Sequence, residues 1–276
     1  EVKTVDEVFQ IISEEFSGYP LDDESVSILQ ANGRILAEDI ISPENVPPFN
    51  RSSVDGYAVI ASDTFGASES MSAQLLKTDP VEMGITPTSP VKRGSAAYIP
   101  TGGELPRNAD AVVMVEYTED HNDEFIYINR PVAPGNNVVL TGDDIRSGGI
   151  VFHSGKILKT ADTGVLASIG VTQVKVKRKL KAGIISTGDE IIPIDKKPEG
   201  SQVRDINSYF LYASLKEYNA EPVIYGIIPD EFEKIKSIAS KAINECDLIC
   251  ISGGSSAGEK DETVKIIESL GAPGVL

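Results

Sequence analysis

Apolar residues toward the C-terminal end of the chain follow two alternating patterns. Short continuous runs of apolar and β-prone residues predict three buried strands, at residues 182–185, 222–228 and 248–251. Apolar residues spaced by three and four positions predict three helices, over residues 207–218, 232–242 and 264–270. Strands that alternate with helices imply a parallel sheet, so we expect an α/β domain in this part of the chain.

The central part of the chain has a different pattern. Residues 47–146 are rich in proline and glycine. They contain four short β-prone runs, at residues 57–60, 97–99, 111–115 and 125–128. This combination is typical of a small all-β domain.

The chain begins with the pattern of an amphipathic helix. Thr4 and Glu7 have the spacing of a capping box. Apolar residues then follow at helical intervals, at Val5, Val8, Phe9, Ile12 and Phe16. Residues 20–46 alternate between short periodic pieces and turns, whereas residues 147–177 contain a helical pattern at 161–169 and a strand-like run at 173–177.

A glycine-rich loop follows the last predicted strand. Its sequence runs Ser252-Gly-Gly-Ser-Ser-Ala-Gly258, and a helical pattern opens near Asp261. Glycine lets the backbone approach a ligand closely, and the free N–H groups at a helix start favour anions. The loop therefore suits a phosphate group. A tight strand-to-helix turn without a ligand explains the same residues, and both interpretations stay open.

Acidic residues follow all three predicted strands at the edge where a parallel sheet binds ligands. They are Asp189, Glu190, Asp230 and Asp261. Carboxylates suit a hard cation such as Mg²⁺, whereas hydroxyls and backbone N–H groups suit phosphate oxygens. The alternative is that each acid caps the helix that follows it.

The overall charge limits the classes of partner. There are 42 acidic and 25 basic residues, which gives a formal net charge of −17. This argues against a nucleic-acid or anionic-membrane surface, although solubility alone would also explain it. Cys246 and Cys250 would lie roughly 13 Å apart on one strand, too far for a disulfide, which favours a reducing, cytoplasmic compartment. No apolar run is long enough to span a bilayer.

Several motifs together resemble the MoeA and gephyrin E-domain family, the molybdopterin molybdenumtransferases. In chain order they are Ser52-Ser-Val-Asp-Gly-Tyr-Ala58, Pro100-Thr-Gly-Gly-Glu-Leu-Pro106 with Ala109-Asp-Ala-Val-Val113, Gly142-Asp-Asp-Ile145, Ile185-Ser-Thr-Gly-Asp-Glu190, Asp205-Ile-Asn207, and Ser252–Gly258 with Asp261. Turn chemistry explains much of the two motifs in the β-rich part. Six motifs in the family's order make the resemblance specific.

The resemblance implies a multidomain fold of the α/β and β class. Residues 1–19 would form a helix packed on the α/β domain, residues 20–46 and 147–177 an elongated linker domain, residues 47–146 the β-rich domain, and residues 178–276 the molybdopterin-binding α/β domain. The C-terminal β domain of the family is expected to be absent from this chain.

The resemblance also implies an activity. Family members insert molybdate into adenylylated molybdopterin with Mg²⁺ and release AMP, as homodimers with shared sites. By motif match the catalytic residues are Asp55, Asp144, Glu190, Asp230 and Asp261, with Glu190 and Asp261 as metal ligands. The expected substrate-binding residues are Thr101, Ser186, Thr187, Gly188, Gly253, Gly254, Ser255, Ser256 and Gly258. The molybdopterin adenylyltransferase is a candidate partner.

The chain departs from the family pattern at two places. Asn50 and Val54 stand where the family usually has Asp and Met, and residues 137–141 lack the arginines that are common there. A non-catalytic molybdopterin-binding or gephyrin-like scaffold is the alternative function, and a nucleotide amidohydrolase with a similar domain is a second rival. The sequence leaves molybdate and tungstate open, since the two oxyanions are nearly isosteric.

Overall fold

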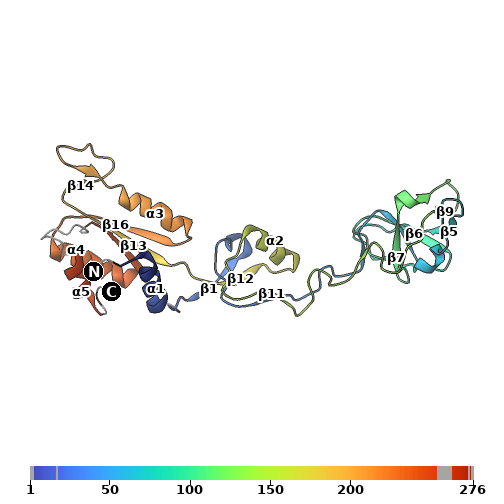
Figure 1. Cartoon of the computed structure of the whole chain (residues 1–276), viewed down its shortest axis with the longest axis horizontal. Coiled ribbons are helices and arrows are strands. Elements are labelled where there is room, and N and C mark those ends of the chain that lie inside the picture. The colour runs from blue at the N-terminus through green and yellow to red at the C-terminus, as the bar shows by residue number, and fades with distance from the viewer. Residues whose placement is uncertain (1–2, 17, 254–262, 273, 275–276) are drawn as a thin grey trace. The chain divides into compact units, whose positions relative to one another are not determined.

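The computed structural model describes residues 3–16, 18–253, 263–272 and 274 (Figure 1). The chain divides into two compact units. The first unit consists of Glu1–Glu38, Gly155–Thr163 and Gln173–Leu276, and the second of Asp39–Ser154 and Gly164–Thr172. The predicted α/β segment therefore lies in the first unit and the β-rich segment in the second, while the two linker segments are divided between them. The finer domain boundaries stay a prediction.

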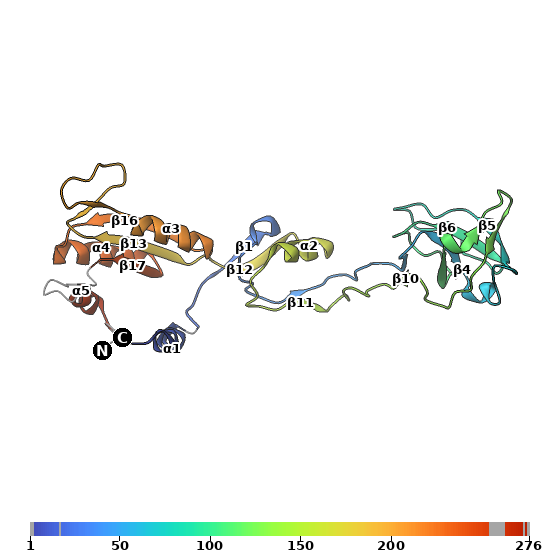
Figure 2. The ribbon, with the colours of Figure 1, turned by 45° about the horizontal axis from the view of Figure 1, so that its top comes forward.

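The first unit contains the parallel sheet that the sequence predicts. Its strands are β13 (Lys181–Thr187), β16 (Glu221–Ile228) and β17 (Leu248–Ser252), in the order β16-β13-β17 (Figure 2). Both pairings are parallel. The helices between and after them are α3 (Asn207–Glu217), α4 (Phe232–Glu245) and α5 (Thr263–Leu270). The apolar runs and helical spacings thus predicted every element of this sheet and its order along the chain.

The strand order decides where a ligand can bind. The crossover from β13 to β16 runs one way across the sheet, and the crossover from β16 to β17 runs back past β13. Because such crossovers are right-handed, α3 and α4 cover opposite faces (Figure 1). On the α4 side, Ile185 packs against Ala239 and Ala242. The direction of winding reverses between β13 and β17, so their carboxyl ends form the switch point where open α/β sheets bind ligands.

Strand β16 contains a bulge opposite β13. Ile184 pairs with Ile224, but Ile185 pairs with Gly226, so Tyr225 is an extra residue in the ladder. The Tyr225 hydroxyl donates to the Glu245 carboxylate over 2.7 Å. Burial is the largest cause that raises the pKa of this phenol.

An ion pair joins the amino ends of the same strands. Asp247 stands just before β17, and its two carboxylate oxygens accept hydrogen bonds of 2.6 Å from the Arg178 guanidinium. The Lys181 N–H donates to it over 2.8 Å and the Tyr19 hydroxyl over 3.3 Å. The Asp247 side chain is only 9% exposed. The Arg178 guanidinium, ahead of the other contacts, lowers the pKa of this carboxyl.

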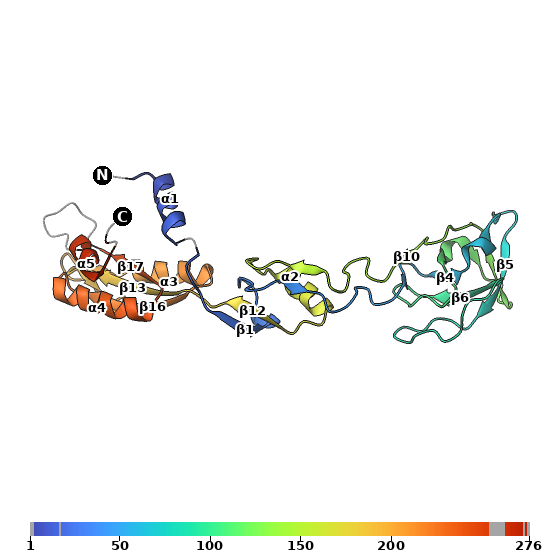
Figure 3. The same ribbon diagram turned by 90° about the horizontal axis from the view of Figure 1, so that it is seen from below.

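The rest of the first unit includes a two-stranded antiparallel sheet and the N-terminal helix. Strand β1 (Asp23–Ser27) pairs with β12 (Gln173–Lys177), which lie side by side in Figure 3. Helix α1 (Val5–Phe16) begins with the predicted capping box, because the Glu7 N–H donates to the Thr4 hydroxyl and the Thr4 N–H to the Glu7 carboxylate. No residue of α1 is buried, so its packing on the sheet stays a prediction.

The second unit is built on a six-stranded mixed sheet. Its order is β7-β4-β6-β5-β9-β8, with bounds Ala111–Met114, Gly56–Val59, Ser95–Ile99, Ala73–Thr78, Phe125–Ile128 and Thr118–Glu119. Strands β5 and β6 pair in parallel, and the other pairs are antiparallel. Alternate residues of β4 and β7 enter two cores, since Tyr57 and Val113 pack in one while Ala58 and Val112 pack in the other. The sheet matches the predicted β-rich domain.

Short elements complete the two units. Strand β2 (Ile40–Ile41) pairs with β11 (Ile150–Phe152) in the second unit. Helix α2 (Thr160–Ser168) matches the helical pattern of residues 161–169. Both cysteines are free, as expected. Among the described residues, no helix is both long enough and apolar enough to cross a membrane.

Candidate functional site

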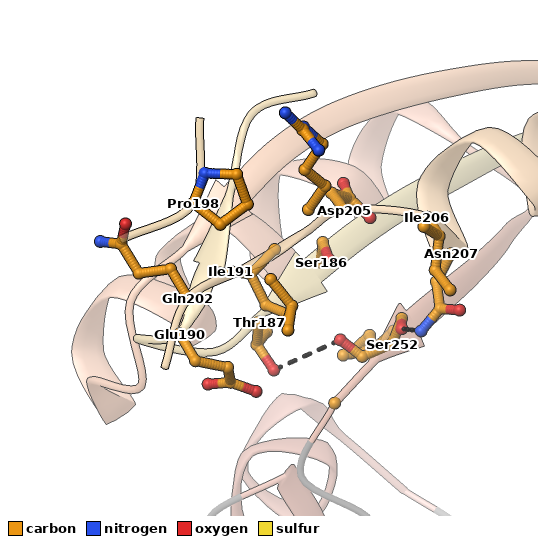
Figure 4. A pocket seen from close by; sticks show the side chains of 14 residues that line it. Ser186, Thr187, Glu190, Ile191, Pro198, Gln202, Asp205, Ile206, Asn207 and Ser252 are labelled. Atoms are coloured by element: carbon orange, nitrogen blue, oxygen red, sulfur yellow. Dashed lines mark hydrogen bonds between the residues drawn. The ribbon is translucent and has the colours of Figure 1, made fainter. Parts of the chain in front are cut away.

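The carboxyl ends of β13 and β17 line a cavity of about 860 Å³ at the switch point (Figure 4). Ser186 and Thr187 enter it from β13, and Ser252 enters it from β17. The remaining wall comes from α3 and from the short strands β14 (Ile191–Ile192) and β15 (Val203–Arg204). Four predicted site residues line this cavity, namely Ser186, Thr187, Glu190 and Gly253. Its volume suits a ligand of the size of a nucleotide.

Polar side chains on the floor of the cavity are held by hydrogen bonds. The Asn207 side-chain amide donates to the Ser252 hydroxyl over 2.6 Å, and the Thr187 hydroxyl donates to the Ser252 carbonyl over 3.5 Å (Figure 4). Because the Ser252 oxygen accepts from Asn207, its own hydrogen is directed elsewhere and can be donated to a ligand. Asn207 is also the first residue of α3, and a helix N-terminus favours negative charge.

Gly253 is required by the packing of the two strands. Its φ is +126°, and a Cβ at this position would lie 2.3 Å from the Thr187 hydroxyl oxygen and 2.5 Å from the Thr187 carbonyl oxygen. Any side chain would therefore collide with the end of β13. From the sequence, this glycine was expected to let the backbone approach a ligand closely. In the structure, the backbone at Gly253 also lies close to Thr187 at the end of β13.

The acidic residues of the first unit lie on two adjacent loops. Glu190 is exposed and lines the cavity, and its carbonyl accepts the Val203 N–H over 2.9 Å. The Asp189 carboxylate accepts the Asp230 N–H over 3.2 Å, so the loop after β13 is tied to the loop after β16. Gly188 lies beside them, at the edge of a neighbouring cavity. Asp230 itself is exposed and lies outside the lining of the larger cavity.

The described residues fit a magnesium ion only in part. No group of three or more acidic, histidine or cysteine side chains suitable for a metal occurs within residues 3–16, 18–253 and 263–272. Mg²⁺ is usually held by one or two carboxylates together with substrate phosphates. An exposed Glu190 carboxylate beside a cavity that can take a nucleotide-sized ligand meets that requirement. The second predicted ligand, Asp261, lies outside the described residues, as do Gly254, Ser255, Ser256 and Gly258.

Asp55 and Thr101 form a pair in the second unit. The Asp55 carboxylate accepts the Thr101 N–H over 2.7 Å and the Thr101 hydroxyl over 3.0 Å. These two bonds, the backbone one first, lower the pKa of Asp55. The acid is therefore held ionised and in a fixed orientation on the surface of the β-rich unit.

Asp144 lies near a basic side chain that the sequence analysis did not select. The Arg51 guanidinium is 3.8 Å from its carboxylate, with both side chains partly exposed. Strand β3 (Arg51–Ser52) pairs with β10 (Val138–Val139), and the Gly102 N–H donates to the Ser52 carbonyl over 2.8 Å. The loops that carry Asp55, Thr101 and Asp144 are thus joined to one short strand.

Several polar residues of these sites were absent from the predicted set, among them Arg51, Asp205, Asn207, Arg204 and Ser252. Arg51 adjoins a quoted motif, and Asn207 and Asp205 lie within another, but none was given a role. Their signal is position: Asn207 starts a helix at the carboxyl edge of the sheet, and Asp205 is a buried acid that accepts the Ser208 N–H over 3.0 Å.

Two family profiles match the chain in succession. Residues 3–170 match the family described as "MoeA N-terminal region (domain I and II)", and residues 183–275 match the "Probable molybdopterin binding domain". The first match alone covers more than half of the chain. This protein belongs to the MoeA family. The resemblance noted from the six motifs, and the MoeA-like multidomain fold that it implied, are confirmed.

Relatives of this MoeA-family chain agree with the assignment. The molybdopterin molybdenumtransferases of Haemophilus influenzae and Bacillus subtilis are each 34% identical, over 253 and 252 residues. A crystal structure of a molybdopterin biosynthesis MoeA protein from Pyrococcus horikoshii is 38% identical over 98% of this chain, with a TM-score of 0.80. The chain spans 61%, 59% and 67% of the length of these three proteins.

Two departures from the family pattern, at Asn50 and at residues 137–141, have structural explanations within this MoeA chain. The Asn50 side-chain oxygen accepts both the N–H and the hydroxyl of Thr141, over 2.9 and 3.0 Å. An aspartate could accept the same two bonds, so the acceptor function of this position is kept. The segment of residues 137–141 lacks arginines, but Arg51 supplies a cation near Asp144 from the neighbouring strand.

Proposed function

We propose that this chain forms part of a molybdopterin molybdenumtransferase, which inserts molybdate into adenylylated molybdopterin with release of AMP. The proposal is supported by the two family matches and by the names of its relatives. The observation that carries it is the cavity at the switch point, where hydroxyl and amide donors gather around the N-terminus of α3. Such donors suit the phosphate oxygens of an adenylylated substrate.

Two of these donors would have different roles: the Ser252 hydroxyl would bind the substrate, and the Asn207 amide would position that hydroxyl. The Ser252 hydroxyl would donate to a phosphate oxygen, because the Asn207 amide occupies its acceptor side and fixes the direction of its hydrogen. Arg204 also lines the cavity and would offset part of the substrate's negative charge in a chain whose net charge is −17. The part of the glycine loop that follows Gly253, including Gly254, would supply backbone N–H groups to the phosphate of the pterin.

The acidic residues would organise the reacting groups. Glu190 would bind Mg²⁺ together with Asp261, and a bound Mg²⁺ would neutralise charge on the phosphate oxygens while AMP departs. Asp230 would contribute from the neighbouring loop, and Asp55 and Asp144 from the second unit. Asp55 suits an electrostatic role, since two hydrogen bonds from Thr101 keep it ionised.

Turnover of adenylylated molybdopterin tests this function. AMP release in the presence of molybdate should be lost in Glu190→Gln and in Asp261→Asn, while both variants keep the wild-type circular dichroism. Glu199→Gln is a matched control, because Glu199 is an acid of the nearby loop that does not line the cavity. Wild-type rates in both site variants would contradict the assignment. Replacing molybdate by tungstate in the same assay decides which oxyanion is used.

A shared site in a homodimer is part of the same proposal. The predicted acids are divided between the second unit, with Asp55 and Asp144, and the first unit, with Glu190 and Asp261. If two subunits complete each site, a mixture of Asp55→Ala and Asp261→Ala subunits should recover activity, because one site in each mixed dimer is intact. No recovery in verified mixed dimers, or a monomer in sedimentation, would contradict sharing.

The cellular setting follows from the same function. We place the protein in the cytoplasm, in line with its two free cysteines, and we propose the molybdopterin adenylyltransferase as the partner that delivers the substrate. Co-sedimentation of the two proteins with and without adenylylated molybdopterin measures that interaction.

A further inference from the structure

A second cavity of about 540 Å³ adjoins the first at the carboxyl edge of the sheet. It lies between β16, the start of α3 and the loop that follows β13. Ile191 and Asp205 line both cavities, so a single ligand could extend from one into the other. Gly188, Asp189 and Asp205 belong to motifs of the sequence, but the proposed phosphate chemistry does not account for this second cavity.

A buried hydroxyl in the wall of this cavity lacks a partner. The Ser208 side chain is 1% exposed, and among the residues that the structure describes nothing hydrogen-bonds to its Oγ. Buried polar groups are nearly always hydrogen-bonded, and leaving one unpaired costs free energy. The hydroxyl lies at the second residue of α3, where its own N–H is already used by Asp205. Its position points to an atom that a ligand brings.

An acceptor stands beside this donor. Asp205 is 5% exposed, and one of its oxygens accepts the Ser208 N–H over 3.0 Å. A carboxylate has about four acceptor sites, so capacity remains for a second donor. The cavity therefore offers a hydroxyl and a carboxylate side by side, on residues fixed by the start of a helix.

The other walls are mostly apolar. Ile224 and Ile227 come from β16, Pro193 and Pro229 from the flanking loops, and Tyr209 from α3. Ile224 and Tyr209 are 42% and 50% exposed, which is unusual for side chains of this size at a sheet edge and leaves them free to contact a ligand. Apolar walls with two adjacent polar groups suit an aromatic ring with a polar edge.

We propose that this cavity binds a planar heterocycle that carries an exocyclic amino group next to a ring nitrogen. The amino group donates to the free acceptor sites of Asp205, and the ring nitrogen accepts from the Ser208 hydroxyl. The inference rests on the proposed function, since adenylylated molybdopterin contains two rings with such an edge, adenine and the pterin. Both share the recognised chemistry, and the test below separates them.

Ring pairs in which an oxo group replaces the amino group test the proposal. Adenosine against inosine probes the purine, and pterin against lumazine probes the pterin. Each second member has an oxygen in place of the amino group and a hydrogen on the neighbouring ring nitrogen, so both the donor and the acceptor of the recognised edge are lost. Binding to the whole chain is measured by ligand-observed NMR titration. The wild-type protein should bind the amino member of at least one pair about tenfold more tightly, as expected when a buried acceptor would lose its donor. The pair that shows this preference identifies the ring.

Two variants assign the preference to the cavity. Asp205→Asn keeps an acceptor for the Ser208 N–H but replaces the other oxygen by a donor, so it should reverse the preference toward the oxo member. Ser208→Ala should weaken binding of the amino member about fivefold or more, within the range of one hydrogen bond. Ser214→Ala in the same helix, outside the cavity lining, should leave all affinities unchanged.

The outcomes separate this proposal from the proposed function. None of the four rings carries a phosphate, so their binding does not depend on the glycine loop or on Glu190. Absence of detectable binding, equal affinity within both pairs, or a preference unaffected by both variants would overturn the cavity proposal and indicate a water-filled space, even if AMP release is intact. A reversed preference in Asp205→Asn supports it even if molybdate insertion is not observed.

Discussion

The two ends of the parallel sheet treat their acidic residues in opposite ways. At the amino end, Asp247 is almost buried and accepts four hydrogen bonds, two of them from Arg178. At the carboxyl end, Glu190 is exposed on a cavity, and the buried Ser208 hydroxyl has no partner among the described residues. One end satisfies its polar groups internally and holds the strands together, whereas the other has an exposed acid and an unpaired hydroxyl beside cavities. We therefore expect stability and ligand binding to depend on opposite ends of a single sheet.

The largest effect is expected from the amino end. Asp247→Ala leaves the Arg178 guanidinium and the Lys181 N–H without their acceptor, which should lower the free energy of unfolding of the first unit by about 3 kcal/mol. Urea denaturation followed by far-ultraviolet circular dichroism measures this, because α3, α4 and α5 all belong to that unit. Asp22→Ala is the control.

Asp22 is a suitable control because it also faces Arg178, at 3.8 Å, but its side chain is 94% exposed. Removing an exposed partner should leave the urea midpoint unchanged, since surface ion pairs contribute little. An equal loss of unfolding free energy in both variants would mean that the hydrogen bonds accepted by Asp247 stabilise the protein no more than an exposed ion pair does.

A smaller loss is expected where the carboxyl end is tightly packed. In Gly253→Ala the added Cβ would lie 2.3 Å from the Thr187 hydroxyl oxygen at a φ of +126°, so the end of β17 must shift. We expect a loss of about 2 kcal/mol, from strain and displaced strand ends. Gly164→Ala in α2 is the matched control, because its Cβ meets nothing within 4 Å. Urea denaturation measures the free energy of unfolding of both variants. Equal values for Gly253→Ala and Gly164→Ala would contradict the packing argument.

The pH dependence of stability distinguishes the two ends further. The pKa of Asp247 is lowered in the folded protein, chiefly by Arg178. Its contribution is therefore fully present above the unfolded pKa, near 3.9, and is lost as pH falls toward the folded value. Unfolding of the wild-type protein by urea, measured from pH 6 down to about pH 3, should lose stability more steeply than unfolding of Asp247→Asn. Parallel curves would show that the ion pair does not couple to folding.

The smallest effect is expected at the open acid of the carboxyl end. Glu190→Gln removes a charge from an exposed side chain, so the free energy of unfolding should change by less than about 0.5 kcal/mol. The same urea experiment measures it, with Asp247→Asn as the matched removal of a charge at the opposite end. A large loss in Glu190→Gln would mean that this carboxylate has a structural role as well.

The sequence predicted the sheet well because its signal is local. Continuous apolar runs marked β13, β16 and β17, and spacings of three and four residues marked the helices. The short strands β14 and β15 were not expected, since two residues carry no period. The four strands predicted in the second unit are correct to within two residues, whereas β5, inside the same sheet, was not predicted.

The parts of the site that the sequence did not provide depend on distant contacts. Arg178 and Asp247 are 69 positions apart, and nothing in either neighbourhood marks the pair. The unpaired hydroxyl of Ser208 becomes visible only when every possible partner can be inspected in space. Motifs identified Ser186, Thr187 and Gly253 correctly as neighbours, because they end adjacent strands, but could not tell that Gly253 packs against Thr187.

The bulge at Tyr225 decides which side chains of β16 face the second cavity. In a regular strand, residues an odd number of positions apart face opposite sides, yet Ile224 and Ile227 both line this cavity, while Tyr225 and Ile228 both pack toward α4. Because Tyr225 is extra, Ile224 and Ile227 are three positions apart in the sequence but two positions apart in the ladder, so they face the same side. The same residues paired without the bulge would keep all the isoleucines but turn Ile227 away from the cavity, so the wall depends on how β16 pairs with β13 as much as on which residues it contains.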